Sequence, residues 1–471
     1  MFSVISGHGF IYEVQTISQI FFPNEKFLMI ESPAEKGVTV RSVHSGGFVL
    51  SAVYENGVLI ADDKRKAGAD IKKSVCSGLY LLLVKITGYE NPWGMLTGVK
   101  PTKLIGELLD KNISEDEIVK KINREYYSDE KKIRFCAEVS KNCREAANNG
   151  GEDATYLYVG VPFCVSRCLY CSFTSYDIKK YRAEDYLRAL KKEMRAARSF
   201  FDGKKIAVYM GGGTPTALDE KNFAALLQTV IENFGANGFY EFTVEAGRPD
   251  TITREKLREM KNNNVTRISI NPQTMNDSTL INIGRGHSAK DIINCFGLAR
   301  GEGFTNINAD LIMGLPGESA EHAMITMRAI EELVPEGVTV HTLAVKRASR
   351  LKEELAVHDF KSGAEIEKML AVARESCEKA GMRPYYMYRQ KNSPGNLENT
   401  GYARRGSECV YNAAIIEEKR TIMSLGAGAV TKIVYNSENR IERLFNVKEP
   451  GEYIKKIDEM IERKRVLTEV L

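Results

Sequence analysis

Residues 156–171 read YLYVGVPFCVSRCLYC and join a run of strand-forming residues to a loop with three cysteines. The first part, YLYVGV at 156–161, is a short apolar and aromatic run that predicts a buried strand. The second part carries Cys164, Cys168 and Cys171 on the loop that follows this strand. Iron–sulfur clusters are ordinarily held by Cys thiolates, so three thiols on one loop indicate a cluster with one iron left open to another ligand.

Zinc is the alternative metal for these thiols. A structural zinc site usually has a fourth Cys or His at a matching spacing, and none of the six histidines lies within 100 residues of the loop. The chain has nine cysteines, and an odd number with one tight cluster argues against a disulfide framework. The cysteines outside the loop are expected to be ordinary buried apolar side chains: Cys76, Cys136, Cys143, Cys295, Cys377 and Cys409.

From residue 154 onward, apolar runs that predict strands alternate with amphipathic runs that predict helices. The run at 219–234 places apolar side chains from Phe223 to Phe234 on one helical face, and Ser288 with Asp291 has the pattern of a capping box. Because nearly continuous apolar strands alternate with helices, a parallel sheet covered by helices is expected. The expected strands are at 156–161, 206–210, 240–245, 266–270, 307–313 and 338–345.

Six β/α units are fewer than the eight of a closed barrel, so we expect an α/β fold with an open, partial (β/α)6 TIM-like barrel. This barrel is expected at 151–350. Residues 1–150 would form an N-terminal α/β domain with a helical connector, which ends in the turn-forming residues NNGGED at 148–153. Residues 351–471 would form a mostly helical C-terminal extension that covers the substrate.

The composition excludes several classes of protein. The chain has 471 residues, with 66 Lys and Arg against 62 Asp and Glu, and a formal net charge of +4. A charge so nearly balanced excludes a strongly basic nucleic-acid scaffold. The N-terminus lacks the early basic residues and the cleavage site of a signal peptide, and no apolar run reaches the roughly 18 residues of a membrane span. We therefore expect a cytoplasmic protein with no nucleic-acid partner and no membrane span.

Polar and glycine-rich elements follow the predicted strands at their C-terminal ends, where parallel β/α proteins place their chemistry. GGGTPT at 211–216 follows the second strand, Glu245 ends the third and Gln273 follows the fourth. Asp310 lies near the end of the fifth. A glycine-rich loop lets a ligand approach backbone amides with no Cβ in the way. Each of these residues alone is commonly a cap or a surface residue, but their shared placement predicts a single site.

The loop CVSRCLYC at 164–171 resembles the CxxxCxΦC signature of the radical S-adenosylmethionine (SAM) superfamily, with Tyr170 as the aromatic residue. The segments YVGVPFC, GGGTPT, VEAGRPD, RISINPQT, IGRGHS and NADLIMGLPGE make the chain similar to oxygen-independent coproporphyrinogen III oxidase, also called coproporphyrinogen dehydrogenase. WGMLTGVKPTKL, HTLAVKRAS and YYMYRQKNSPGNLENTGYA resemble the HemZ-type branch of that family. By motif, the resemblance covers residues 93–471.

The resemblance implies that Cys164, Cys168 and Cys171 are catalytic and bind a 4Fe-4S cluster, whose open iron is chelated by the amino and carboxylate groups of SAM. It also implies that Tyr158 is catalytic and hydrogen-bonds near the cluster, and that Phe163 contacts the cofactor beside the first cysteine. The other implied cofactor contacts are Tyr170, Gly212, Gly213, Thr214, Glu245, Gln273, Arg285 and Asp310. Carboxylates and an arginine suit the charges of SAM, which is a zwitterion with a sulfonium.

The implied reaction is an oxidative decarboxylation in heme and porphyrin biosynthesis. A 5′-deoxyadenosyl radical removes a hydrogen from the β-carbon of a propionate, carbon dioxide leaves and a vinyl group remains. Two rounds convert coproporphyrinogen III to protoporphyrinogen IX. The implied partners are a small-molecule tetrapyrrole substrate and an electron donor such as flavodoxin or ferredoxin. Candidates for pairing with the substrate carboxylates, each of them equally explained as a solvated surface charge, are Lys346, Arg347, Arg389 and Arg404.

Two positions depart from the pattern of the relatives. Gly160 stands where many relatives have the histidine of Y-x-H-x-P-F-C. The stretch ENTGYA at 398–403 lacks the His and the Trp of the HNxxYW motif of related heme chaperones. Two alternatives to the oxidase remain open: a heme chaperone or other heme-binding relative, and a radical SAM enzyme that acts on another tetrapyrrole.

Overall fold

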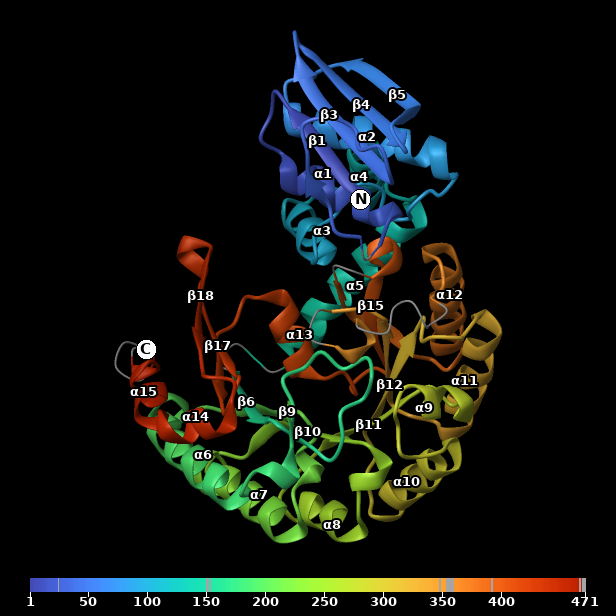
Figure 1. Cartoon of the computed structure of the whole chain (residues 1–471). Coiled ribbons are helices and arrows are strands. Elements are labelled where there is room, and N and C mark those ends of the chain that lie inside the picture. The colour runs from blue at the N-terminus through green and yellow to red at the C-terminus, as the bar shows by residue number, and fades with distance from the viewer. Residues whose placement is uncertain are drawn as a thin grey trace.

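The computed structural model describes residues 1–23, 25–149, 151, 154–346, 349–352, 360–390, 393–465 and 467 (Figure 1). Across these residues the strands form a five-stranded sheet, an eleven-stranded sheet and a two-stranded ladder. The eleven-stranded sheet curves into an open barrel whose outer rim is lined by helices (Figure 1). These helices are α6 (Ala183–Ala197), α7 (Glu220–Phe234), α8 (Arg254–Asn262), α10 (Ala289–Gly301) and α11 (Ala320–Leu333).

Among the residues described, six parallel strands form the centre of the larger sheet, in the order β13-β12-β11-β10-β9-β6. These six strands keep their chain order in the sheet, and each connection between two of them contains an α-helix. Their bounds are β6 (Thr155–Val161), β9 (Ile206–Gly212), β10 (Phe239–Gly247), β11 (Arg267–Gln273), β12 (Ile307–Met313) and β13 (Gly337–Thr342). The expected α/β class and partial barrel are confirmed.

In α7 and α10 the sequence provides both an apolar face and a cap for the helix. In α7, Phe223, Leu227 and Val230 are fully buried, and the side chain of Asp219 accepts a hydrogen bond from the backbone of the first turn. The capping box of Ser288 and Asp291 is present at the start of α10. The apolar faces of these helices cover the outside of the parallel strands and make the main hydrophobic core.

The C-terminal part contributes strands to the barrel sheet, where we expected a mostly helical extension. At one edge, β15 (Glu398–Ala403) pairs antiparallel with β13, and β14 (Arg383–Arg389) pairs with β15. At the other edge, β16 (Ile422–Leu425) pairs in parallel with β6 and is followed by β17 (Val430–Tyr435) and β18 (Arg440–Phe445). An open barrel exposes unpaired backbone groups at both edges, and these strands pair with them. The helices of this part are α12 (Gly363–Lys379), α13 (Val410–Glu417), α14 (Pro450–Lys455) and α15 (Ile457–Glu462).

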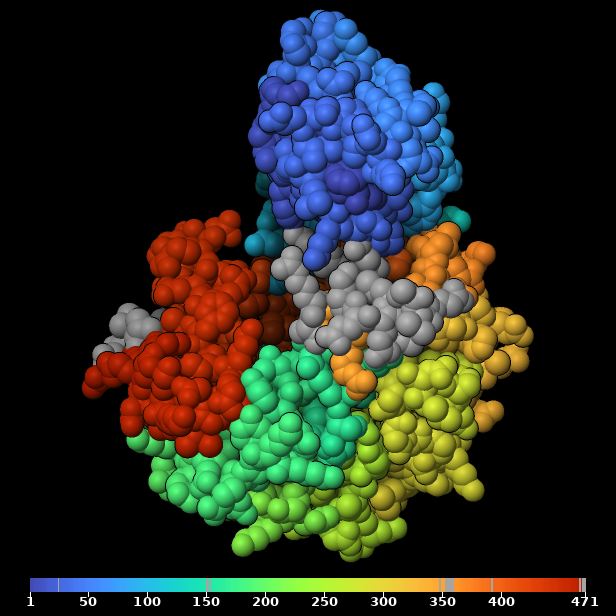
Figure 2. Space-filling model, viewed as in Figure 1, coloured from blue at the N-terminus to red at the C-terminus, as the bar shows by residue number. Residues whose placement is uncertain are grey.

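The N-terminal part folds around a core of its own and forms a lobe that projects from the barrel (Figure 2). Its sheet has the order β2-β1-β3-β4-β5, and α1 (Ile11–Phe21) and α2 (Ile71–Thr87) pack together against it. The strands are β1 (Phe2–Ser6), β2 (Leu28–Met29), β3 (Val38–Ser45), β4 (Phe48–Glu55) and β5 (Val58–Lys66). Helices α3 (Pro101–Asp110), α4 (Glu115–Tyr126) and α5 (Glu130–Asn148) follow and lead to β6. The domain limits at 150 and 350 stay predictions.

All nine cysteines are free thiols. Of the cysteines outside the loop, Cys76 is half-buried and the others are buried, which agrees with their predicted role as apolar side chains. Within the described part of the chain, every helix is too short or too polar to span a bilayer.

Candidate active site

The cysteine loop begins where β6 ends. Cys164 lies in the short strand β7 (Phe163–Cys164), which pairs with β8 (Tyr176–Asp177) and so closes the loop. Cys168 is buried, and Cys164 and Cys171 are half-buried. Burial raises the pKa of Cys164 and of Cys171, and the neighbouring thiols raise it further. Thiolates at these positions therefore need a compensating positive charge, which a bound metal supplies.

The glycine-rich loop after β9 packs directly against the cysteine strand. The amide of Thr214 donates to the Phe163 carbonyl at 2.7 Å, and the amide of Gly213 donates to the Val161 carbonyl at 2.8 Å. A Cβ on Gly213 would collide with the Phe163 backbone, so glycine is required for this approach. Thr214 Oγ1 lies 3.6 Å from Cys164 Sγ. The ring of Phe163 is fully buried in the core, so it is the backbone of this residue that meets the loop.

Glu245 lies near the end of β10, where two donors hold its carboxylate. The Tyr209 hydroxyl donates to Oε1 at 2.6 Å, and the amide of Gly212, which has a φ of +115°, donates to Oε2 at 3.3 Å. Burial raises the pKa of Glu245 to about 7 against the effect of the Tyr209 hydrogen bond, and the charge of Asp310 adds to the rise. Near neutral pH this carboxyl group can therefore bind a cationic group or exchange a proton.

Tyr158 belongs to a stack of tyrosines inside the barrel. Its ring centroid lies 6.3 Å from that of Tyr209 and 6.2 Å from that of Tyr411, and the last two are 4.7 Å apart. Burial raises the pKa of Tyr158 well above its usual value, so its hydroxyl stays protonated and can donate a hydrogen bond. Tyr411 comes from α13, so the C-terminal part closes the interior of the barrel beside the predicted cofactor contacts.

Arg285 lies against the cysteine loop, where its Nη2 donates to the Tyr170 hydroxyl at 2.7 Å. Among the described residues, the buried Nε and Nη1 of Arg285 have no hydrogen-bond partner, and neither have the two ring nitrogens of His287. Burial and the charge of Arg285 lower the pKa of His287 to about 4, so the ring is neutral. Buried polar atoms without partners are costly. A polar ligand beside the cysteine loop would find free hydrogen-bonding atoms here.

Gln273 and Asp310 complete the polar set on β11 and β12. Asp310 is half-buried and accepts a hydrogen bond from Asn308 Nδ2 at 2.7 Å. Gln273 is buried with a φ of +70°, which is uncommon for a residue other than glycine. The register of β11 against β12 also shifts between Ile270 and Gln273. Such irregular backbone redirects a side chain and is often found at functional sites.

One of the cationic candidates lies near the cysteine loop. Burial lowers the pKa of Lys346, and the Cys171 thiol acts in the opposite direction, which places this ammonium within electrostatic reach of the loop. Arg347 lies outside the described residues.

The two other cationic candidates lie at opposite ends of the barrel strands. Arg389, the last residue of β14, is buried at the end of the sheet where β13 also ends. Its Nε and Nη1 donate to the backbone carbonyls of Asn396 and Leu96, and its Nη2 has no hydrogen-bond partner among the described residues. Arg404 follows β15 at the opposite end of the barrel, where its amide donates to the Glu336 carbonyl just before β13. Arg404 is therefore remote from the strand ends that carry the candidate site.

Besides Tyr411 of α13, three residues of this site were not among the predicted contacts: Tyr209, Arg248 and His287. Each lies two or three positions from a predicted residue, within or beside a segment that the family resemblance had already marked. Their side chains belong to the site through contacts with residues of other strands and loops, which the sequence pattern does not show.

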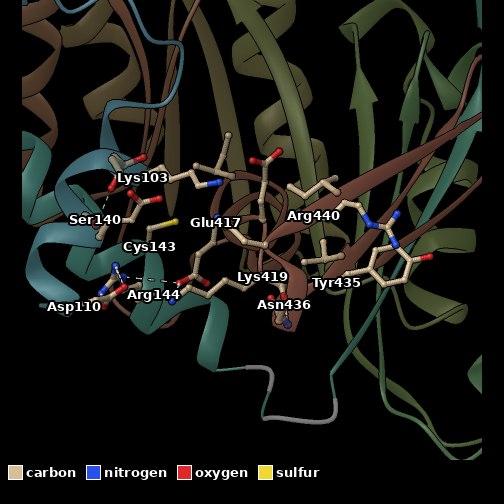
Figure 3. Close-up of a pocket in the computed structure, with 17 residues that line it drawn as sticks. Lys103, Asp110, Ser140, Cys143, Arg144, Glu417, Lys419, Tyr435, Asn436 and Arg440 are labelled. Carbon is tan, nitrogen blue, oxygen red and sulfur yellow. Dashed lines mark hydrogen bonds and ion pairs between the residues drawn. The ribbon is translucent and has the colours of Figure 1, made fainter. Parts of the chain in front are cut away.

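A separate cavity of about 260 Å³ lies outside the barrel (Figure 3). It is bounded by α3, α5, the end of α13 and the β17–β18 hairpin, and basic and acidic side chains mix around it, including Lys103, Arg144, Glu417 and Arg440. None of the predicted cofactor contacts lines this cavity, so it is not part of the candidate active site.

Comparison with known proteins defines the class first. The Radical SAM superfamily profile matches residues 158–330, which span β6 to α11. Coproporphyrinogen III oxidase (HemN) from Escherichia coli, a radical SAM enzyme, has a similar fold, with a TM-score of 0.54 and 24% sequence identity over 67% of this chain and 72% of that chain. Residues 158–330 thus form a radical SAM domain.

The relatives narrow this class to a family. The oxygen-independent coproporphyrinogen-III oxidase-like protein HemZ of Bacillus subtilis is 36% identical over 401 residues, which are 83% of this chain and 80% of that protein. The heme chaperone HemW of the same organism is 31% identical over 58% of this chain and 69% of that protein. The chain belongs to the family of HemZ-like, oxygen-independent coproporphyrinogen-III oxidase-like proteins.

Radical SAM proteins use a 4Fe-4S cluster and SAM, and the residues at the strand ends fit both. The loop supplies three thiols, the glycine-rich turn leaves room beside them, and the unpartnered donors of Arg285 and His287 suit a polar ligand. Among the described residues, no three Cys, His, Asp or Glu side chains are drawn together at metal-ligand distances. The assignment of the three thiols as cluster ligands is therefore a proposal.

Proposed function

We propose that this chain is an oxygen-independent coproporphyrinogen III oxidase, which decarboxylates two propionates of coproporphyrinogen III to give protoporphyrinogen IX. The observation that carries the proposal is the meeting of the cysteine loop with the polar residues Glu245 and Arg285 at one end of the parallel strands. The name of the HemZ relative, which is called oxidase-like, supports the substrate class.

In this proposal the chain's own residues bind and orient the cofactors. Cys164, Cys168 and Cys171 hold the cluster, and the free Nε and Nη1 of Arg285 receive the carboxylate of SAM. Glu245, near the end of β10, receives a cationic or hydroxyl group of the same molecule. When bound, the cluster and SAM supply a radical that can remove hydrogen from an unactivated carbon.

The substrate side of the proposal rests on charge. Lys346 is the described cationic candidate within reach of the loop, and it would pair with one propionate of the tetrapyrrole. Each round releases carbon dioxide and leaves one electron for an acceptor. The proposal therefore includes an electron acceptor for the product, and a donor such as flavodoxin or ferredoxin for the cluster.

Heme chaperone function is the rival that the HemW relatives raise. The stretch that would correspond to the chaperone motif is not available to a ligand here. Glu398 is buried and accepts hydrogen bonds from Trp93 Nε1 at 2.7 Å and from Lys132 Nζ at 2.6 Å. Asn399 is fully buried and accepts from the amide of Thr342. These contacts favour the oxidase over heme capture at this position.

The test is an anaerobic assay of the reconstituted full-length chain with coproporphyrinogen III, SAM, a reductant and an electron acceptor. Mass spectrometry should show the loss of two carboxyl groups per substrate molecule. Cys168→Ala should abolish SAM cleavage and decarboxylation, because it removes a proposed cluster ligand. Cys295→Ala is the matched control, since this buried thiol lies on α10 outside the loop, and its activity should stay within about twofold of the wild type.

Two results would contradict the proposal. The first is tight, stoichiometric heme binding without any loss of carboxyl groups, which would support the chaperone. The second is SAM cleavage that persists in Cys168→Ala, which would remove the cluster from the mechanism.

A further inference from the structure

Arg248 is a buried cation for which the proposed function gives no role. It directly follows β10, and its side chain is only 6% exposed. Its Nη1 donates to Ser166 Oγ at 2.6 Å and lies 3.9 Å from Cys168 Sγ. Ser166 and Cys168 both belong to the cysteine loop, so this guanidinium joins the strand-end loop after β10 to the proposed cluster ligands.

Asp250 holds the same guanidinium from the other side. Arg248 Nε donates to Oδ1 at 2.9 Å, and Nη2 donates to Oδ2 at 2.7 Å. This two-point pairing fixes the plane of the guanidinium and leaves Nη1 directed at the loop. The Asp250 side chain is 28% exposed, so its charge is better screened by water than that of Arg248.

We propose that Arg248 sets the reduction potential of the iron–sulfur cluster, an inference that rests on the proposed ligation by Cys164, Cys168 and Cys171. Hydrogen bonds and charge near the sulfurs tune such potentials. The reduced cluster carries one more negative charge than the oxidised cluster, so a fixed, buried cation stabilises the reduced form more and raises the potential. Asp250 acts in the opposite direction, because its negative charge opposes the added electron.

The two side chains give predictions of opposite sign. Arg248→Gln removes the cation and should lower the reduced-to-oxidised ratio at a fixed potential at least tenfold, which corresponds to about 59 mV for a one-electron couple. Asp250→Asn removes the opposing anion while keeping Arg248, and it should raise the potential. If Arg248 and Asp250 only held the cysteine loop in place, the two substitutions would not shift the reduction potential in opposite directions.

The measurement is a redox titration of the anaerobically reconstituted full-length chain, followed by electron paramagnetic resonance without SAM or substrate. Iron and sulfide content are determined for every sample. Arg254→Gln is the matched control, because it removes a positive charge that is paired with Glu302 on the surface of α8. Its potential should equal that of the wild type.

The outcomes separate this inference from the proposed function. Fully loaded variants whose potentials do not change, or change in the same direction, overturn the role of Arg248 and leave the oxidase standing. If Arg248→Gln does not take up the cluster, the reduction potential of Asp250→Asn is the test. A raised potential supports the inference, and an unchanged potential overturns it. A wild-type chain that binds no cluster overturns the proposed function and this inference together.

Discussion

Among single residues, Glu245 changes its charge within the physiological pH range, because its surroundings raise the pKa of its carboxyl group. Its pKa is raised to about 7 by burial, while the Tyr209 hydroxyl favours the ionised form. If the carboxylate binds SAM, SAM affinity should fall as the pH drops through about 7, because protonation then competes with binding. Tyr209→Phe removes the donor, raises the pKa further and should move this fall to higher pH.

Equilibrium dialysis of SAM against the reconstituted chain between pH 5.5 and 9 measures this dependence. Tyr411→Phe is the control, since this residue stacks on Tyr209 and no hydrogen bond joins it to Glu245 among those of the described residues. The midpoint should shift in Tyr209→Phe and stay in place in Tyr411→Phe. Equal midpoints in the wild type and both variants would show that Glu245 does not titrate in SAM binding.

The residues of the site differ in how far the sequence can predict them. Consecutive parallel strands end at the thiols, the glycine-rich turn and Glu245. Because these strands keep their chain order in the sheet, residues at their C-terminal ends lie close together, and the sequence can predict this. Tyr411 could not be found this way, because α13 reaches the barrel interior only through long-range packing. Arg389 stays a candidate, and its contact with the backbone of Leu96, 293 positions away, could not be predicted from the motif pattern either.

Among the elements, the short helices α14 and α15 depend on one buried carboxylate of α6. Glu193 is 1% exposed and accepts hydrogen bonds from Tyr453, Asn446 and Lys464 and from the amide of Gly426. Glu193→Gln would leave the Lys464 ammonium buried without a counter-charge, which costs about 3–5 kcal/mol of folding free energy. We expect a clearly lower midpoint of chemical denaturation and faster proteolysis after residue 446.

The matched control for Glu193→Gln is Glu232→Gln. Glu232 pairs with Lys191 on the exposed surface of the neighbouring helices, where an ion pair contributes about 0–1 kcal/mol. A Glu193→Gln variant as stable as this control would show that apolar packing alone anchors the C-terminal helices. The sequence did not predict this anchor, because the C-terminal residues that bind Glu193 lie more than 200 positions from it in the chain.

At the scale of the whole molecule, the segment around Trp93 ties the N-terminal lobe to the barrel. Trp93 is fully buried, and its Nε1 donates to Glu398 on β15, 305 positions away. Lys132 of α5 pairs with the other oxygen of the same carboxylate, and Asn91 donates to the backbone carbonyl of Gly395. Two of the motifs that mark the HemZ-type branch, WGMLTGVKPTKL and the segment ending in ENTGYA, therefore meet in one buried network.

This network predicts that lobe and barrel are energetically coupled through Glu398. Trp93→Phe leaves one buried carboxylate oxygen without its donor, which costs about 1–3 kcal/mol, and Glu398→Gln weakens the same contact from the other side. Because both substitutions affect the same hydrogen bond between Trp93 and Glu398, a double-mutant cycle in chemical denaturation should give a coupling energy of about 0.5–3 kcal/mol. Limited proteolysis of Trp93→Phe should also release the N-terminal lobe faster than in the wild type. Additive losses in the cycle, with an unchanged cleavage pattern, would mean that the lobe is held by its apolar contacts and not by this carboxylate.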